Sequence, residues 1–170
     1  MPSPHPFRVG VTELLHQPGA RRRERLEGVL GDLAVTGSRV IDGSAVEIDV
    51  LLESVHEGVL ASGEVSVEWA GECRRCLNPA TGEVHAEFRE LFEERPTEGD
   101  SYPLSHEQVD LEPLARETVL LELPQAPLCR DDCLGLCARC GADLNEGPCD
   151  CEPEPDPRWA ALDALRTDQD

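Results

Sequence analysis

The sequence predicts an α+β fold: an antiparallel β meander or partly closed barrel, one or two packed helices, and a small cysteine-rich C-terminal segment. Apolar and polar side chains alternate in several stretches between residues 46 and 92, which is typical of antiparallel strands with one buried face. A helical pattern follows at residues 111–123. Six of the eight cysteines then lie between residues 129 and 151.

The first 53 residues are expected to supply a strand at 7–11 and a hairpin. Residues 11–28 mix helical spacing with a break at Pro18-Gly19, and their cluster of arginines is expected on a solvent-exposed face or a loop. Residues 33–41 are expected to pair with residues 45–53 across a turn at Asp42-Gly43, a dipeptide that favours hairpins. The cluster consists of Arg21, Arg22, Arg23 and Arg25.

The next strands are predicted from their period of two. Residues 45–53, 61–72 and 83–92 each place apolar side chains on one face, and the pair Cys73–Cys76 falls in the connection between the last two. These stretches indicate a meander that buries one side. The residues expected on the buried face are Val46, Ile48, Val50, Leu52, Val65, Val67, Trp69, Val84, Ala86 and Phe88.

Residues 94–109 are polar and rich in helix breakers, so they are expected to form a loop. Asp110 can then cap a helix over residues 111–123, with Pro113 in its first turn and Pro124 after its end. Its apolar stripe should lie on the sheet, and a second short helix is expected from Arg158 to Arg166. The residues offered for packing are Leu111, Leu114, Val119 and Leu121 in the first helix, and Trp159, Leu162 and Leu165 in the second.

This pattern divides the chain into an α+β domain at 1–125, a cysteine-rich module at 126–151, and an acidic linker with a short helix at 152–170. The net charge is −20, which disfavours a broad electrostatic grip on phosphates and indicates basic protein partners. The N-terminus lacks the pattern of a signal peptide, and no apolar run is long enough to cross a membrane. A cytoplasmic location, where thiols stay reduced, is therefore expected.

Reduced cysteines at short spacings favour a metal site, and zinc prefers four thiolates supplied as closely spaced pairs. The chain offers four such pairs, so two closed four-cysteine zinc sites are predicted. In the favoured arrangement, the last four cysteines close on one ion, while the other four join the tail to the strand connection. The competing arrangement is one compact site made of Cys129, Cys133, Cys137 and Cys140. The eight candidate ligands are Cys73, Cys76, Cys129, Cys133, Cys137, Cys140, Cys149 and Cys151.

Other functions of these cysteines are less consistent with the sequence. Cys133 to Cys140 has the spacing that holds an iron–sulfur cluster in radical enzymes, but only 30 residues follow, too few for the barrel of those enzymes. A redox pair would need a strand–helix context, whereas Cys73-Arg-Arg-Cys76 connects two strands. The five histidines are scattered and no phosphate-binding glycine loop is present, so we identify no catalytic residue and no small-molecule substrate.

Three segments together resemble a known family. They are ECRRCL after an alternating strand, LELPQAPLCRDDCLGLCARCGADLN, and the terminal DPRWAALDAL. They are similar to the YceD family of large ribosomal RNA subunit accumulation proteins, in its long form with six tail cysteines. The resemblance spans nearly the whole chain. It implies a role in accumulating 23S ribosomal RNA, and it brings no established catalytic residue.

The leading hypothesis is a non-enzymatic factor for large ribosomal subunit assembly, with zinc as a structural element. Its partner would be a basic ribosomal protein or an assembly intermediate. The alternative is direct binding of ribosomal RNA by a positive patch, since a guanidinium makes two hydrogen bonds to a phosphate. A thiol redox or RNA-processing protein is the third class. The patch would combine Arg21, Arg22, Arg23 and Arg25 with Arg74 and Arg75.

Overall fold

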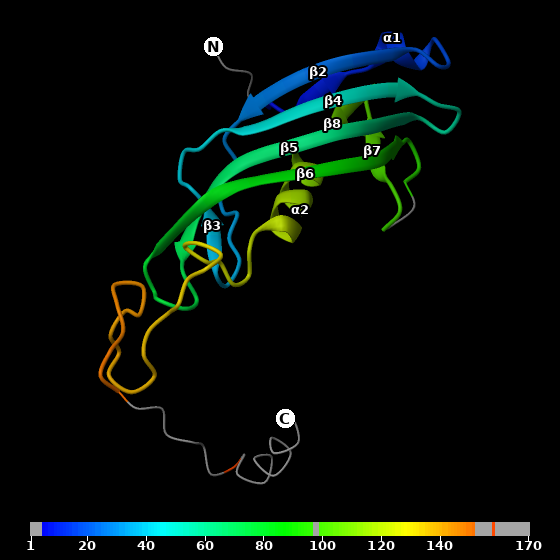
Figure 1. Cartoon of the computed structure of the whole chain (residues 1–170). Coiled ribbons are helices and arrows are strands. Elements are labelled where there is room, and N and C mark those ends of the chain that lie inside the picture. Colours follow the sequence, from blue (N-terminus) through cyan, green and yellow to red (C-terminus); the bar gives the residue numbers. More distant parts are fainter. Residues whose placement is uncertain (1–4, 97–98, 152–157, 159–170) are drawn as a thin grey trace.

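The computed structural model describes residues 5–96, 99–151 and 158 of the chain (Figure 1). Within this part, eight strands form one curved sheet in the order β1-β8-β7-β6-β5-β4-β2, with β3 paired to β5 off this path. The pairs are antiparallel except β6 with β7. The strands are β1 (Arg8–Gly10), β2 (Arg21–Gly28), β3 (Ser38–Val40), β4 (Val46–Ser54), β5 (Val59–Glu72), β6 (Pro79–Glu93), β7 (Tyr102–Ser105) and β8 (Gln108–Asp110), and the helices are α1 (Thr12–Leu15) and α2 (Glu112–Glu122).

The predicted α+β class and the buried faces of the three central strands are confirmed. In β4 the even-numbered apolar residues from Val46 to Leu52 are at most 1% exposed, and the alternating residues of β5 and β6 continue the same layer. The helix α2 packs against β5 and β6 and closes this layer from one side (Figure 1). The core is therefore a sheet face covered by one helix and by the N-terminal segment around Phe7.

The helix α2 begins where the sequence predicts. The Glu112 backbone N–H donates to Oδ1 of Asp110 at 3.1 Å, and Pro113 occupies the first turn, where a missing N–H removes no helical hydrogen bond. Leu114 and Val119 face the sheet as expected, but Leu121 does not, because it is 84% exposed. The buried arc of the helix is centred near Ala115, and Leu121 lies just outside it.

The expected hairpin between residues 33–41 and 45–53 is wrong. β3 pairs with β5, through Val40 and Trp69 among others, because both edges of β4 are already taken by β2 and β5. Residues 33–40 instead fold on themselves, with the Val35 N–H donating to the Ser38 carbonyl and the Val40 N–H to the Leu33 carbonyl.

Two segments in which no strand was expected contain strands. The arginine-rich residues 21–28 form β2, whose eight residues pair in register with β4. The predicted loop at 94–109 contains β7 and β8, and β8 pairs with β1. β2 is highly charged, and β7 and β8 are short. All three lie at or near the border of the sheet, so their sequences show little alternation of apolar and polar residues. The predicted helix at 158–166 lies outside the described residues. No described helix is long and apolar enough to cross a membrane.

Candidate metal sites

The eight cysteines come together as two separate groups of four. In each group, the four Sγ atoms lie within 4.8 Å of one another. We call Cys73, Cys76, Cys129 and Cys133 the sheet site, and Cys137, Cys140, Cys149 and Cys151 the tail site. All eight are free thiols. The grouping is that of the favoured arrangement, and the compact site from Cys129 to Cys140 does not form.

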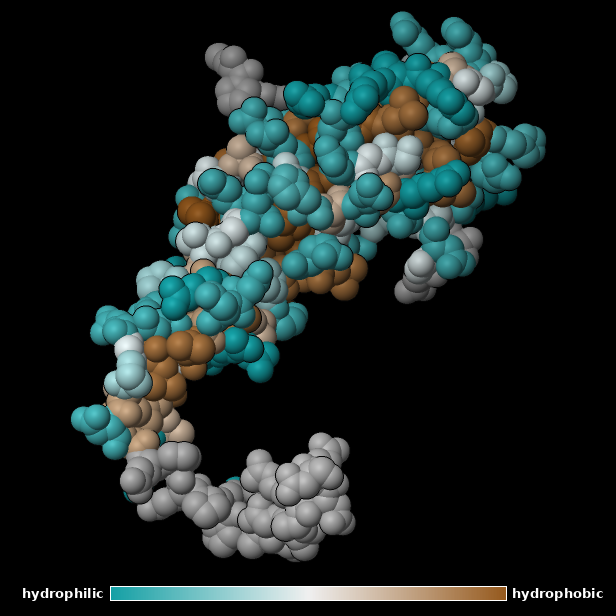
Figure 2. All heavy atoms as spheres, in the orientation of Figure 1, coloured by the Kyte–Doolittle hydropathy of each residue, from teal (hydrophilic) through white to brown (hydrophobic). Residues whose placement is uncertain are grey.

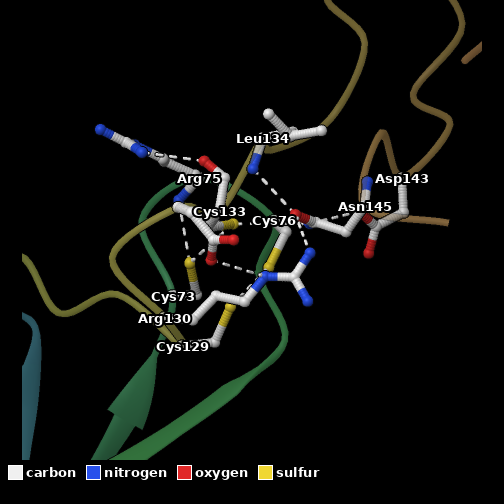
Figure 3. Close-up of polar contacts among 10 residues, drawn as sticks. Cys73, Arg75, Cys76, Cys129, Arg130, Cys133, Leu134, Asp143 and Asn145 are labelled. Carbon is white, nitrogen blue, oxygen red and sulfur yellow. Dashed lines mark hydrogen bonds and ion pairs between the residues drawn. The ribbon is translucent and has the colours of Figure 1, made fainter. Parts of the chain in front are cut away.

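The sheet site joins two parts of the chain that lie far apart in sequence. Cys73 and Cys76 sit in the turn between β5 and β6, whereas Cys129 and Cys133 follow α2. Figure 3 shows the four sulfurs directed toward one another. Cys73, Cys76 and Cys133 are at most 4% exposed and form a small cluster of their own, apart from the main core. The site therefore replaces an apolar contact at this end of the sheet.

The distances between sulfurs fit a tetrahedral ion. Sγ of Cys73 lies 3.7 Å from that of Cys133, and Sγ of Cys76 lies 3.5 Å from that of Cys129. Zinc bound to four thiolates at about 2.3 Å spaces its sulfurs about 3.8 Å apart, whereas a disulfide brings them to about 2.05 Å. The donor set and its spacing therefore match a metal site and do not match disulfide bonds.

Both sites begin with a turn of the same design. In the sheet site the Leu77 N–H donates to the Cys73 carbonyl at 2.9 Å, and the Arg75 N–H points at the Cys73 sulfur at 3.5 Å. In the tail site the Gly141 N–H donates to the Cys137 carbonyl at 2.9 Å. The N–H of Arg139 likewise lies 3.4 Å from the Cys137 sulfur. N–H groups aimed at sulfur stabilise a thiolate, which is the form that binds metal.

The surroundings of the sheet-site thiols lower the pKa of Cys73 and raise that of Cys129. Burial opposes ionisation of Cys73, but the backbone N–H groups of Cys129, Cys76 and Arg75 outweigh it and lower its pKa to about 6. The side chain of Cys76, followed by burial, raises the pKa of Cys129 to about 12. The site thus combines a thiol that ionises readily with one that holds its proton more tightly, and a bound metal ion would favour release of both protons.

The tail site repeats this arrangement with greater exposure. The backbone N–H groups of Cys140 and Arg139 lower the pKa of Cys137 to about 6, whereas contact with the Cys140 side chain raises that of Cys151 to about 12. Cys140 is exposed and the other three thiols are half-buried. A small hairpin with a bridge between Leu136 and Asp143 carries the first two ligands.

Polar residues surround the sheet site and tie it to the tail hairpin (Figure 3), and the sequence analysis named only Arg75 among them, as part of the candidate RNA-binding patch. The Arg75 guanidinium donates to the Cys133 carbonyl at 2.8 Å, so it crosses the sheet site. Asn145 donates from Nδ2 to the Cys133 sulfur at 3.5 Å, and its Oδ1 accepts from the Arg130 guanidinium at 2.8 Å. Asp143 accepts from the side chains of both Asn145 and Asn78. The Asp-Leu-Asn spacing after the glycine turn is a weak signal that only the folded structure makes specific.

The arginines proposed as one RNA-binding patch lie in two places. Arg25 on β2 is level with Asp49 on β4 and Glu64 on β5, and eight residues of β5 separate that level from the end of the strand, before Cys73. At about 3.3 Å per residue this is roughly 26 Å. Arg23 and Arg25 also bind Asp49 at 2.6 and 3.0 Å, and their hydrogen bonds lower its pKa.

Comparison with known proteins identifies the family. A family model described as "Large ribosomal RNA subunit accumulation protein YceD" matches residues 61–166, more than half of the chain. The chain belongs to the YceD family. The resemblance drawn from the cysteine motifs is thereby confirmed. The matched span includes all but the first two residues of β5, and the whole of β6, α2 and every cysteine of both sites.

Relatives of this YceD protein are found in bacteria and plants. An uncharacterized protein of Mycobacterium tuberculosis is 37% identical over 167 residues, which cover 92% of this chain and 80% of the relative. A maize protein named large ribosomal RNA subunit accumulation protein YCED homolog 1, chloroplastic, is 25% identical over 86% of this chain and 61% of its own length. No solved structure matches the chain.

Proposed function

We propose that this YceD protein is a non-enzymatic factor that supports accumulation of 23S ribosomal RNA and assembly of the large ribosomal subunit in the cytoplasm. Family membership supports this, because the family description and the maize relative's name both refer to large-subunit ribosomal RNA accumulation. The two thiol tetrads would hold structural zinc, since closed four-cysteine sites leave no open coordination position for a substrate. On this view the eight cysteines are architectural.

The sheet site would fix the tail to the end of the sheet. Besides the four sulfurs, the Arg74 N–H donates to the Pro127 carbonyl at 2.9 Å, and the Leu136 N–H donates to the Arg75 carbonyl at 3.1 Å. These bonds place the tail hairpin beside the β5–β6 turn. A metal ion there would make the sheet and the tail one unit, whereas the tail site would order only the last residues of the module.

The sheet face opposite α2 is the surface that we assign to a basic protein partner. It carries an acidic patch of five exposed glutamates on β4, β5 and β6, which the pairing register places in neighbouring rows. Hydrophilic residues cover much of the molecule over these strands in Figure 2. Within the described residues, one of the five, Glu83, forms an ion pair, with His85, and the other four form none. The patch consists of Glu47, Glu64, Glu68, Glu83 and Glu87.

Direct RNA binding by the arginines has weaker support. Arg21 is paired with Glu53, and Arg23 and Arg25 share Asp49, so most of their positive charge is already offset on the sheet. Their distance from Arg74 and Arg75 leaves no continuous positive surface. A chain of net charge −20 also repels phosphates at long range, and this repulsion opposes the counterion-release gain on which most RNA binding depends.

A pull-down from extract of the source cells tests this function. The wild-type protein at low salt should recover large-subunit ribosomal proteins, and recovery of no ribosomal component or assembly factor would contradict the proposal. A variant with Glu64, Glu68, Glu83 and Glu87 changed to glutamine should lose most of this recovery. The matched control removes four exposed carboxylates elsewhere and should keep it. These control substitutions are Glu13→Gln, Glu57→Gln, Glu94→Gln and Glu122→Gln.

A further inference from the structure

Leu77 occupies a position where glycine would be expected. It follows the second cysteine of the sheet-site turn, as Gly141 does in the tail site, and the two turns share the same backbone hydrogen bonds. Both residues adopt the left-handed conformation, with φ of 62° for Leu77 and 73° for Gly141. A side chain makes this conformation costly, and only a few residue types adopt it routinely.

Exposure adds a second cost at Leu77. Its side chain is 62% exposed, so the folded monomer gains little by burying it. Steric crowding does not explain why one turn has leucine and the other glycine, because a Cβ at Gly141 would meet no atom within 4 Å. A leucine that is both strained and exposed is explained if a partner buries it.

Leu77 borders a preformed groove of about 710 Å³ at the end of the sheet. Its walls come from the turn before β3, the end of β5, the sheet-site turn and the connection after α2. They are held together by close contacts. The Ser38 hydroxyl donates to the Pro124 carbonyl at 2.9 Å, and a Cβ on Gly37 would lie 2.3 Å from the Gln125 carbonyl oxygen. The groove is therefore a fixed feature of the fold.

The groove combines apolar walls with free positive charge. Val35, Ala70 and Pro127 line it, and so do Arg39 and Arg74. Neither arginine forms an ion pair or a side-chain hydrogen bond with the residues that the structure describes, in contrast to the arginines of β2. Glu72 also lines the groove, so the guanidinium and carboxylate groups of the lining sum to +1.

We propose that this groove binds a short segment of a partner protein that carries an apolar side chain flanked by carboxylates. The apolar side chain packs on Leu77 and the groove walls, and each carboxylate takes two hydrogen bonds from a guanidinium. Two free arginines beside a glutamate suit one or two carboxylates and are too few for a run of phosphates. This surface is distinct from the acidic patch, so the protein would contact an acidic segment here and a basic partner on the sheet face.

Site-specific cross-linking tests the proposal. The full-length, metal-containing protein with Leu77→benzoylphenylalanine is irradiated in extract of the source cells, and the cross-linked peptide is sequenced. We expect an adduct with another protein, through a segment with acidic residues next to the attachment point. Adding Arg39→Glu and Arg74→Glu should reduce its yield roughly tenfold or more. The same photoreactive residue at Leu121, which is exposed on α2, is the control and should not give this adduct.

Several results would overturn the proposal: no adduct, an adduct with RNA, or an adduct with residues 152–170 of the same chain. An adduct that survives both arginine substitutions would also overturn it. A competition experiment separates binding from folding. Unlabelled Leu77→Gly should melt at a higher temperature than the wild type, since glycine relieves the left-handed strain, yet at least about tenfold more of it should be needed to suppress the adduct. Changing the acidic patch should leave the adduct intact, which separates this proposal from the proposed function.

Discussion

Removing one ligand from each site should have very different consequences for the sheet. Cys76→Ser takes a ligand from the sheet site, which joins Cys73 to Cys133 across 60 residues of sequence. Treated as a cross-link, closure of a loop of that length lowers the conformational entropy of the unfolded chain. This raises the free energy of unfolding by about 4 kcal/mol. Cys137→Ser takes a ligand from the tail site, whose loop of roughly 14 residues corresponds to about 3 kcal/mol by the same relation. Loss of the tail-site ion should therefore destabilise the tail and leave the sheet nearly unchanged.

Circular dichroism of the two variants, with metal analysis of the same samples, measures this difference. For a chain of this size about 4 kcal/mol lowers the melting temperature by roughly 8–16 °C, so the β-sheet transition of Cys76→Ser should fall by that amount. The sheet transition of Cys137→Ser should change much less, because no residue of the tail site belongs to the main core. Each variant should contain one metal ion fewer than the wild type.

Two results would contradict these different roles of the two sites. If Cys76→Ser melted with the wild type, the sheet site would not stabilise the sheet. If Cys137→Ser lowered the sheet transition as far as Cys76→Ser, the two sites would form one unit and the distinction between them would fail.

Three further predictions follow from burial and contact distances. A chelator in excess should remove metal in two phases, the tail-site ion first, because the sheet-site thiols Cys73, Cys76 and Cys133 are at most 4% exposed; a single phase would contradict this. In urea unfolding, Leu114→Ala should lower the free energy of unfolding by about 2–5 kcal/mol and Leu121→Ala by less than about 0.5 kcal/mol, because only Leu114 is buried. Equal losses of stability would show that α2 does not pack on the sheet through the face described. Gly63→Ala should lower the stability by about 1–3 kcal/mol, since its Cβ would lie 2.0 Å from the Asp49 carbonyl oxygen. Gly31→Ala should be nearly neutral, because its Cβ would meet open space. Thermal melts in which Gly31→Ala is the less stable variant would contradict the pairing register of β4 and β5.

The central strands and α2 could be predicted because their signals are local. Alternation in β4, β5 and β6 follows from burying one face, and Pro113 and Pro124 mark the ends of a helix wherever it packs. The partner of β3 could not be predicted, because the turn at Asp42-Gly43 favours a hairpin that β2 prevents by taking one edge of β4. That competition involves residues about 25 positions apart and leaves no local trace.

The candidate metal sites follow the same division. Cysteine spacing predicted the four pairs and favoured the grouping that the structure shows, since pairs close together in sequence can close on one ion. The surrounding bonds of Arg75 and Asn145 depend on how the tail crosses the sheet site, which spacing does not determine. The left-handed Leu77 also became visible only by comparison with Gly141 in the folded turn.

Metal analysis of the full-length protein, purified under reducing conditions without added metal, tests the central claim that two structural metal sites hold this fold together. Plasma mass spectrometry with a protein concentration from amino-acid analysis gives the number of ions per chain. We expect close to two zinc ions per chain, falling to one in Cys76→Ser and to one in Cys137→Ser. A fully folded protein that contains no metal would contradict it.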